Sequence, residues 1–414
     1  MQHIESPLKI CLMSYRSNPH CGGQGVYIQH LSRALKALGH HVEVISGPPY
    51  PVLDKDIPLI CLPSLDLYNP NDLFRVPKLS ELSNATNLIE WLKVSTMGFP
   101  EPYTFGLRAY KFLKNKANKY DIIHDNQSLS YGLWGIKRYI PTTVTIHHPI
   151  TVDRRIDLNA ETVFWKKIKH FRWYSFINMQ KRVARTFSHI ITVSKKARED
   201  IVKEFGIPIE RFRVVENGID TDIFYPIPEI PREKNRIIVT NSADIPLKGL
   251  SYLLKAVYKL SKDRKIKLIV IGTPKENGSI VKLIRKLGIG DVVKFTGRVD
   301  NKEFVRQYAK ASVAVVPSVY EGFGFPAGEA MACAVPVVAT MAGALPEVVG
   351  DAGILVPPAD WEAIYKSIVE VLDNFELAQK LGEAGYNRVQ NNFTWKRAAE
   401  KTVFAYRETI NAYH

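Results

Sequence analysis

Two glutamates, Glu321 and Glu329, stand with seven residues between them around a glycine-rich stretch. Carboxylates accept strong hydrogen bonds from hydroxyl groups, and two at this spacing can reach different hydroxyls of one extended ligand. Gly322, Gly324 and Gly328 allow the main chain to approach that ligand closely. The stretch predicts a binding turn for a hydroxyl-bearing ligand; for such a pair taken alone, a surface turn with two solvated glutamates is the alternative.

A strand and a helix are expected to hold this turn. Residues 311–318 are mostly apolar and β-branched, which is typical of a short buried strand, and a helix over 325–334 is expected to follow. In open α/β sheets ligands bind at the carboxyl ends of strands. The helix directs backbone N–H groups and about half a positive charge toward that edge. The elements therefore favour an anionic group beside the two carboxylates.

The size and composition of the chain are those of a protein with two globular domains. Its 414 residues are 46% apolar, enough to bury two cores. The four cysteines form no C-x-x-C pair and are expected to be reduced thiols of a cytoplasmic protein. No apolar run approaches the length of a membrane span, and the amino terminus lacks a basic region leading into an apolar one. Neither a membrane span nor a signal peptide is therefore expected.

Positive charge is concentrated in segment 165–198. The net charge is +15, and this segment holds ten Lys or Arg residues and no acid. Its interleaved aromatic residues include Trp165, Phe171, Trp173, Tyr174 and Phe176. Basic side chains beside aromatic rings suit an anionic lipid surface, where each is worth roughly 1 kcal/mol. We expect contact with an anionic membrane surface, at the inner face of the cell membrane; a solvated helix face whose aromatics belong to the core is the alternative. No nucleic-acid partner is expected, because no recognised motif accompanies the charge.

Strand and helix patterns alternate in the first half of the chain. Residues 8–14 predict a strand, 26–38 an amphipathic helix and 41–46 a second strand, which together make a βαβ unit. Further short strands are predicted at 122–124, 142–146 and 189–193. This alternation predicts a parallel, doubly wound sheet. Residues 50–105 are poorly periodic and are expected to form an insertion near the ligand site.

A second domain of the same kind is predicted after a proline-rich linker at 225–231. Its predicted strands are 236–240, 267–271, 292–295, 311–318, 335–339 and 353–356. The predicted fold class is therefore α/β, with two Rossmann-like, doubly wound domains at 1–225 and 226–394 that face a cleft.

Four segments together resemble the retaining glycosyltransferases of the GT-B fold, in glycosyltransferase family 4 (group 1), over nearly the whole chain. They are the glycine loop and helix that lead to Gly39-His40-His41-Val42, the turn Val215-Glu-Asn217-Gly218-Ile-Asp220 with Phe224, the pair Lys248-Gly249, and the stretch Glu321 to Ala330. The resemblance implies transfer of a sugar from a UDP- or GDP-linked donor to a hydroxyl acceptor. It also implies that a helix at 395–414 packs back on the first domain.

The resemblance places the donor in the second domain. Glu321 would bind hydroxyls of the donor sugar and Glu329 the ribose, while the backbone amides of Gly324 and Phe325 would face the diphosphate. Lys248 would neutralise the leaving diphosphate, a role often worth about 3 kcal/mol. A surface lysine before a helix is the alternative for Lys248.

The resemblance also assigns residues of the first domain. The amides of Gly22 and Gly23 would meet the donor phosphate, the alternative being an ordinary strand-to-helix turn. His147, after a predicted strand, matches a cleft histidine that orients the reacting groups, and completes the predicted catalytic set with Lys248 and Glu321. His124 and Asp125, at another strand end, are the predicted acceptor-side residues. A hydrogen-bonded structural role is the alternative for such strand-end residues.

No metal site and no required cofactor are expected. His147 and His148 are adjacent on an extended chain and point to opposite faces, which disfavours shared coordination. Asp220-Thr-Asp222 matches a metal-chelating D-x-D pattern, but it lies in the Asn-Gly turn near the linker.

One donor contact of the family is missing. The family carries an arginine five or six residues before the lysine, where this chain has Ser242 and Ala243. Arg298 and Arg16 are both candidates to replace it, and a different donor geometry stays open.

The mechanism implied by the resemblance is front-face displacement, because no carboxylate nucleophile is evident. The departing diphosphate would help to take the acceptor's proton, and domain closure would exclude water. A GT-B epimerase or phosphorylase, and a non-catalytic basic protein that binds lipid or nucleic acid, are the alternatives. Both a lipid-linked acceptor and a soluble sugar fit these residues.

Overall fold

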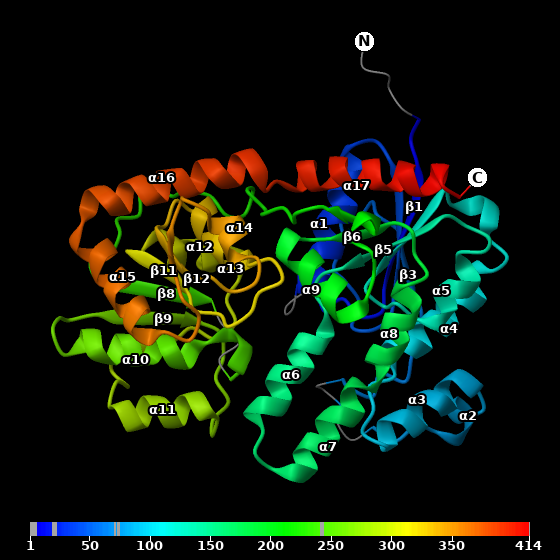
Figure 1. Ribbon diagram of the computed structural model, residues 1–414, viewed down its shortest axis with the longest axis horizontal. Coiled ribbons are helices and arrows are strands. Elements are labelled where there is room, and N and C mark those ends of the chain that lie inside the picture. The colour runs from blue at the N-terminus through cyan, green and yellow to red at the C-terminus, as the bar shows by residue number, and fades with distance from the viewer. Residues whose placement is uncertain (1–5, 19–22, 70–71, 73–74, 241–243, 414) are drawn as a thin grey trace. The chain divides into compact units, whose positions relative to one another are not determined.

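The computed structural model describes residues 6–18, 23–69, 72, 75–240 and 244–413. The chain forms two compact units. Unit 1 comprises Met1–Val193, Ala197–Glu216 and Trp395–His414, and unit 2 comprises Ser194–Lys196 and Asn217–Thr394. Each unit has a parallel sheet covered by helices (Figure 1), so the predicted α/β, doubly wound fold class is confirmed.

Unit 1 contains a seven-stranded sheet of order β3-β2-β1-β4-β5-β6-β7. The strands are β1 (Lys9–Ser14), β2 (His41–Ser46), β3 (Leu59–Cys61), β4 (Ile122–Asn126), β5 (Thr142–Ile146), β6 (Ile190–Thr192) and β7 (Phe212–Val214). Every residue of β4 and β5 is buried, as expected for parallel strands covered on both faces. The strand order reverses between β1 and β4, which are direct neighbours.

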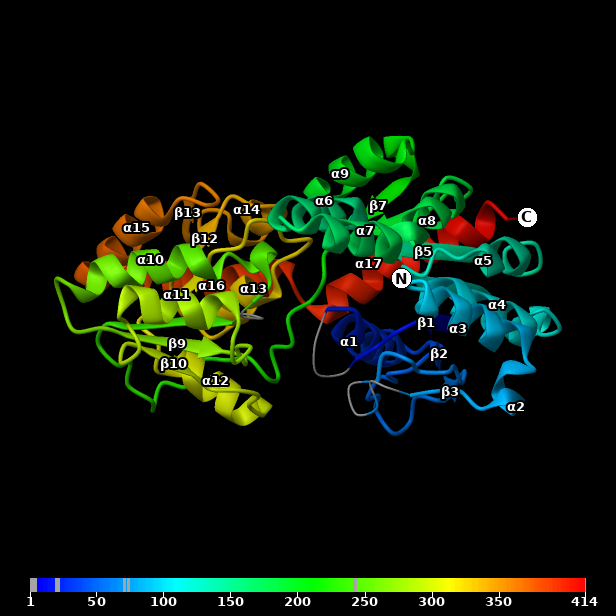
Figure 2. The same ribbon diagram turned by 90° about the horizontal axis from the view of Figure 1, so that it is seen from below.

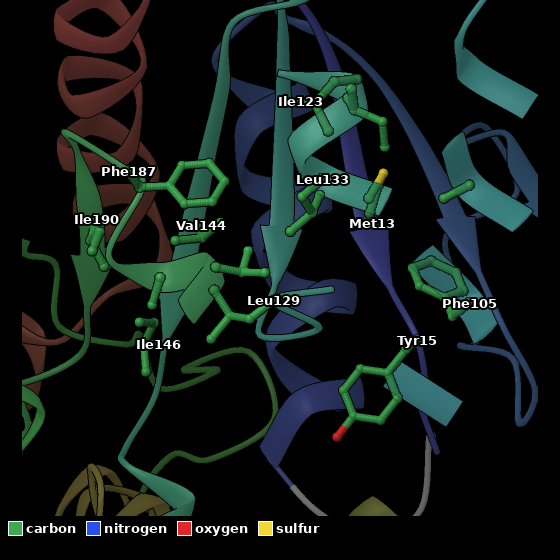
Figure 3. Packing of buried hydrophobic residues seen from close by; sticks show 14 of the residues in the cluster. Met13, Tyr15, Phe105, Ile123, Leu129, Leu133, Val144, Ile146, Phe187 and Ile190 are labelled. Atoms are coloured by element: carbon green, nitrogen blue, oxygen red, sulfur yellow. The ribbon is translucent and has the colours of Figure 1, made fainter. Parts of the chain in front are cut away.

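The helices of unit 1 lie on both faces of this sheet. They are α1 (Gly23–Ala37), α2 (Leu79–Leu82), α3 (Ala85–Ser95), α4 (Glu101–Leu113), α5 (Tyr131–Ile136), α6 (Ile150–Ala160), α7 (Phe164–Trp173), α8 (Ile177–Ala184), α9 (Lys195–Phe205) and α17 (Trp395–Asn411), with short 3₁₀ helices η1 (Ala117–Lys119), η2 (Tyr174–Phe176) and η3 (Ile209–Arg211). Helices α4, α5 and α8 cover one face, where Phe105 and Leu133 pack with Ile123 and Val144 (Figure 3). Helices α1 and α17 lie side by side on the other face (Figures 1 and 2).

Unit 2 contains a six-stranded sheet of order β10-β9-β8-β11-β12-β13. The strands are β8 (Arg236–Thr240), β9 (Lys267–Ile271), β10 (Val293–Phe295), β11 (Val313–Val316), β12 (Val337–Thr340) and β13 (Ile354–Val356). The helices are η4 (Pro246–Lys248), α10 (Leu250–Ser261), α11 (Ser279–Leu287), α12 (Asn301–Ala309), α13 (Phe325–Ala332), α14 (Leu345–Val349), α15 (Trp361–Asp373) and α16 (Phe375–Asn392). Helices α10, α11 and α15 supply one layer of the core, and α10 and α11 lie side by side in both views (Figures 1 and 2).

Local chemistry sets several helix ends in unit 2. Asp300, Asp360 and Asn374 cap the starts of α12, α15 and α16, because each side chain accepts a hydrogen bond from a backbone N–H in the first turn. Gly288 ends α11 at φ +65°, a conformation that glycine adopts without strain.

The segment 50–105 is more regular than its sequence predicts. It contains β3, which pairs in parallel with β2 and extends the sheet, followed by α2 and α3. β3 has only three residues, too few for a period-2 pattern to show. Among the described residues, no helix is long and apolar enough to cross a membrane.

Candidate active site

Unit 2 places a lysine against a glutamate where its strand order reverses. β8 and β11 are neighbours at this point. Lys248 ends η4, which follows β8, and Glu321 lies in the loop that follows β11. Lys248 Nζ donates a hydrogen bond to Glu321 Oε1 at 2.6 Å. The pair therefore lies at the edge where open α/β sheets bind ligands.

Backbone packing fixes the position of this pair. Gly249 has a φ of +64°, and a Cβ atom there would lie 1.9 Å from the carbonyl oxygen of Pro317, so only glycine lets the turn after Lys248 approach the end of β11. Ser318 Oγ donates a second hydrogen bond to Glu321 Oε1, at 2.9 Å. The side chains of Lys248 and Glu321 are 27% and 10% exposed. The ion pair is thus partly shielded from water, and Lys248 keeps part of its side-chain surface exposed.

The turn after β12 holds the backbone of Glu321. Ala344 N–H donates to the carbonyl oxygen of Glu321 at 2.9 Å. Gly343 has a φ of +57°, and a Cβ there would lie 1.9 Å from the same oxygen. Three successive connections, after β8, β11 and β12, therefore position one carboxylate.

Glu329 lies on α13 and is partly exposed. Burial raises the pKa of Glu329 to about 7, although a hydrogen bond from Tyr308 and the charge of Lys248 act in the opposite direction. Tyr308 Oη is also 3.0 Å from Thr240 Oγ1, which ties it to the end of β8. Helix α13 begins after Gly324, whose φ is +104° and which, as a glycine, has no side chain to cap that start. A carboxylate and a helix amino terminus thus face the same edge, an arrangement suited to a phosphate next to a diol.

Unit 1 places His147 directly after β5, beside the end of β4. His147 Nε2 is 2.6 Å from Asn126 Oδ1, and the ring of Tyr27 contacts the imidazole edge-on at 4.7 Å between centroids. Burial, with smaller contributions from the imidazoles of His148 and His124, lowers the pKa of His147 to about 3. At neutral pH His147 is therefore an uncharged imidazole.

His124 and Asp125 lie inside unit 1, on β4. His124 Nδ1 is 2.6 Å from Tyr406 Oη and its Nε2 is 2.6 Å from Thr145 Oγ1, so both ring nitrogens have partners. Burial lowers the pKa of His124 to about 3. Asp125 accepts hydrogen bonds from Ser128 Oγ and from the backbone N–H of Leu129. These contacts favour a structural role at the strand end, and acceptor contact by His124 and Asp125 stays a prediction.

The loop after β1 leads into α1, the helix that begins at Gly23. Gly23 is exposed, whereas Gly22 lies outside the described residues. A Cβ on Gly25 would lie 2.2 Å from the carbonyl oxygen of Asn18, so this first turn packs closely on the loop. Arg16 Nη1 donates to both carboxylate oxygens of Glu101, at 2.9 and 3.0 Å. Burial nevertheless raises the pKa of Glu101 to about 7.

Known proteins match both units of the chain. The family described as Glycosyltransferase Family 4 matches residues 21–223, and the family described as Glycosyl transferases group 1 matches residues 225–388. A protein named MMP alpha-(1->4)-mannosyltransferase, from Mycolicibacterium hassiacum, is 45% identical over 408 residues, which cover 97% of this chain and 98% of that protein. The chain belongs to glycosyltransferase family 4 (group 1).

Solved structures share the fold of this glycosyltransferase. Sucrose-phosphate synthase from Thermosynechococcus elongatus matches with a TM-score of 0.74 and 24% identity, over 98% of this chain and 100% of that one. Anabaena Alr3699/HepE in complex with UDP and glucose matches with a TM-score of 0.70 and 17% identity, over 96% and 98%. The fold is GT-B, as the sequence predicted, and membership of the family implies a nucleotide-sugar substrate.

The structure of the glycosyltransferase brings several predicted site residues together within each unit. In unit 2, Lys248 contacts Glu321, while Gly324, Phe325 and Glu329 lie at or in α13. In unit 1, His147 directly follows β5, whereas the neighbouring strand β4 runs on to Asn126, so His124 lies in the middle of that strand and not at its end as predicted, with Asp125 next to it. The substrate roles of these residues stay predictions.

The arginine missing from this glycosyltransferase has no assigned substitute. Ser242 and Ala243, which occupy its place, lie outside the described residues. Arg16 is engaged by Glu101, and Arg298 is exposed after β10. The ion pair of Arg16 and the exposure of Arg298 do not rank one arginine above the other as a diphosphate ligand.

Four residues of the candidate site were not singled out from the sequence. Asn126 and Gln127 contact His147, Ser318 contacts Glu321, and Tyr308 contacts Glu329. The polar run that begins at the end of β4 was a usable signal for the first two. Tyr308 gave none, because it lies near the end of an amphipathic helix, where an aromatic residue is typical of core packing.

The basic segment 165–198 divides into exposed and packed aromatic residues. Trp165 and Phe171, on α7, are 75% and 63% exposed. Trp173 instead stacks on Phe99 at 4.8 Å, and Tyr174 Oη donates to Asp157 at 2.6 Å. Surface exposure therefore holds for Trp165 and Phe171, whereas Trp173, at the end of α7, and Tyr174 pack against other residues of unit 1.

The Asp220-Thr-Asp222 pattern forms a local turn. Asp220 Oδ1 accepts hydrogen bonds from the backbone N–H groups of Asp222 and Ile223, at 3.0 and 3.3 Å. Within the described residues, no three side chains of His, Cys, Asp or Glu are grouped in a way that could hold a metal ion.

Proposed function

We propose that this glycosyltransferase transfers mannose, with retention, from a nucleotide-diphosphate mannose to the 4-hydroxyl of a mannose-containing acceptor. The observation that carries the sugar and the linkage is the 45% identity, over 97% of the chain, to a protein named as an α-(1→4)-mannosyltransferase. The anomeric carbon can keep the α configuration in two ways. Either the acceptor attacks on the face from which the leaving group departs, or two successive inverting displacements take place. In unit 2, Glu321 is already bound to Lys248 and Ser318, which favours the single front-face step.

The donor is proposed to bind unit 2, within a functional domain at 226–394. Glu321 would accept hydrogen bonds from hydroxyls of the mannose, and Glu329 from those of the ribose. The amides of Gly324 and Phe325 would receive the diphosphate, with about half a positive charge from α13 behind them. Lys248 would stabilise the charge that develops on the leaving diphosphate, held in place beforehand by Glu321.

The acceptor is proposed to bind a domain at 1–225, completed by the helix at 395–414. Gly22 and Gly23 would add backbone amides to the donor phosphate. His147, neutral because burial depresses its pKa, would orient hydroxyls of the reacting sugars without adding positive charge. The departing diphosphate would then take the acceptor proton, and exclusion of water would protect the donor from hydrolysis. His124 and Asp125 would shape the acceptor side of this edge.

Transfer assays test this proposal directly. GDP-mannose, UDP-mannose and UDP-glucose are offered with a methyl glycoside of α-(1→4)-mannobiose, and the product linkage is read by NMR. We expect one mannosyl donor to give a new α-(1→4) bond. Glu321→Gln should lower kcat about 100- to 1,000-fold, the loss typical of one preorganised charge contact. Transfer of glucose but not mannose, or a β-linked product, would overturn the proposal.

A second proposal concerns the location of the acceptor. We propose that α7 contacts an anionic lipid surface at the inner face of the cell membrane, where it would meet a lipid-linked acceptor. Phe164, Trp165 and Phe171 of α7 are 68%, 75% and 63% exposed, and lysines lie between them. Large exposed aromatics beside basic side chains suit an anionic bilayer interface.

Vesicle sedimentation tests the membrane proposal. Binding is compared on phosphatidylcholine alone and on phosphatidylcholine with phosphatidylglycerol. We expect binding to the anionic vesicles only, weakened by salt and by the double change Trp165→Ser with Phe171→Ser. Tyr139→Ser is the control, because Tyr139 is 50% exposed in unit 1 but lies outside α7. Equal binding by both variants would count against α7 as the contact.

A further inference from the structure

The end of β4 carries a buried amide whose orientation is fixed by what surrounds it. Asn126 is fully buried and is the last residue of β4. Its Nδ2 is 3.5 Å from the backbone carbonyl of Gln24, in the first turn of α1, and 3.5 Å from Ser14 Oγ. A carbonyl oxygen only accepts hydrogen bonds, so the NH₂ group of Asn126 must face α1. Its Oδ1 must therefore face the opposite way, toward His147.

This orientation determines where the imidazole of His147 carries its proton. Asn126 Oδ1 is 2.6 Å from His147 Nε2, and an amide oxygen can only accept. Nε2 must therefore donate, which leaves the lone pair on Nδ1. No hydrogen bond from the described residues reaches Nδ1. His147 as a residue is partly exposed, which supports access of a ligand to this acceptor atom.

The neighbouring residue fixes the backbone that carries the imidazole. Gln127 Oε1 accepts a hydrogen bond from His147 N–H at 2.7 Å, and its Nε2 donates to the carbonyl of His148 at 3.0 Å. Gln127 itself has a φ of +56°, an uncommon value for a residue with a side chain. Gln180 Nε2 donates to the carbonyl of Gln127 at 3.0 Å and supports this conformation. A strained backbone conformation that several neighbouring residues hold in place is typical of functional sites.

We propose that Asn126 is a positioning residue that holds His147 in its Nε2-protonated tautomer, so that Nδ1 accepts a hydrogen bond from a hydroxyl of the bound sugar. Asn126 also contacts the backbone of Gln24 in the first turn of α1. The start of this helix therefore helps to hold the amide in the orientation that sets the tautomer. The kinetic part of this inference rests on the proposed transferase reaction, whereas the tautomer itself does not.

Imidazole ¹⁵N NMR of the full-length protein tests the tautomer without substrate. The chain has 11 histidines, and His147→Gln identifies the His147 signals. We expect the wild-type protein to show protonated Nε2 and unprotonated Nδ1 from pH 6 to pH 9. Asn126→Ala should give a mixture of tautomers. Asn126→Asp keeps an acceptor in the same place, and should keep Nε2 protonated while moving His147 protonation toward neutral pH.

Kinetics with the active donor then separate positioning from folding. Asn126→Ala should lower kcat about 10- to 100-fold with little change in donor KM, a loss typical of removing the partner that orients a histidine. Asn126→Asp should recover part of this rate at high pH and lose it as the pH falls. Thr143→Ala is the control, because it removes a part-buried hydrogen bond from β5 to the carbonyl of His189 and Thr143 has no hydrogen bond to His147. An unchanged tautomer in Asn126→Ala, or equal kcat and pH profiles in the Ala and Asp variants, would overturn the inference. Absence of mannosyl transfer in every variant would instead count only against the proposed reaction.

Discussion

Tyr406 Oη lies 2.6 Å from His124 Nδ1, although 282 positions separate the two residues in sequence. The contact joins α17, near the end of the chain, to β4 in the centre of the sheet of unit 1. Both residues are buried, so the hydrogen bond is shielded from water. The tyrosine thereby satisfies an imidazole nitrogen that would otherwise be buried without a partner.

Tyr406→Phe should destabilise unit 1 by about 1–3 kcal/mol, because it leaves His124 Nδ1 unpaired in the interior. Urea unfolding followed by tryptophan fluorescence measures this loss. Phe404→Leu is the matched control on α17, since Phe404 is 64% exposed and its replacement should change the unfolding free energy by less than about 0.5 kcal/mol. A loss of equal size in both variants would mean that helix packing, and not this hydrogen bond, is being measured.

Lys248→Met should lower kcat about 100- to 1,000-fold if the lysine stabilises the leaving diphosphate. The loss should appear in kcat and in kcat/KM alike, because the interaction strengthens as charge develops. Steady-state kinetics with the active donor provide the measurement. Lys255→Met, on the exposed side of α10, removes the same charge away from Glu321 and should have little effect. Similar rates in the two variants would exclude the catalytic role.

Gly249→Ala should cost more than Gly288→Ala, although the two glycines have nearly the same backbone conformation, with φ of +64° and +65°. Both changes carry the left-handed penalty of about 1 kcal/mol. Only at Gly249 would the new Cβ lie 1.9 Å from a carbonyl oxygen, that of Pro317, whereas nothing lies within 4 Å at Gly288. We expect an added loss of about 1–3 kcal/mol in thermal unfolding, with reduced activity from a displaced Lys248. Equal losses would show that the loop after β11 relaxes freely.

Glu329→Gln should stabilise the protein above pH 7 relative to the wild type. Folding raises the pKa of Glu329 from 4.5 to about 7, so the folded state holds this proton more tightly than the unfolded state does. The wild-type unfolding free energy should therefore fall as the pH rises from 4.5 to 7, and the glutamine variant should lack that contribution, about 1–3 kcal/mol. Denaturation at pH 4.5, 6 and 8 measures it. Glu276→Gln, in an exposed loop of the same unit, is the control. A constant difference between Glu329→Gln and wild type across this range would contradict the assignment.

Residue type and strand-end position predicted much of the candidate site. Glu321 and Lys248 each follow a strand, and parallel strands bring their carboxyl ends to one edge, so their proximity was foreseeable. Their direct contact was not, because it depends on Gly249 and Gly343, which let three connections meet. The sequence also did not show whether such a side chain points into the unit or away from it. His124 and His147 look alike in sequence, yet both ring nitrogens of His124 have partners, while only Nε2 of His147 has a hydrogen-bond partner among the described residues.

Unit 1 is made of separate stretches of the chain, so the order in which the chain is synthesised decides when the unit is complete. Its sheet is made from the first half of the chain, but α17 comes from Trp395–His414, after the whole of unit 2. On the ribosome, domains generally fold as they emerge, amino-terminal ones first. In this chain, the face of β4 and β5 that α17 covers stays without that helix while Asn217–Thr394 is translated. A chain that stops before Trp395 therefore lacks the helix whose Tyr406 contacts His124, and its unit 1 stays incomplete.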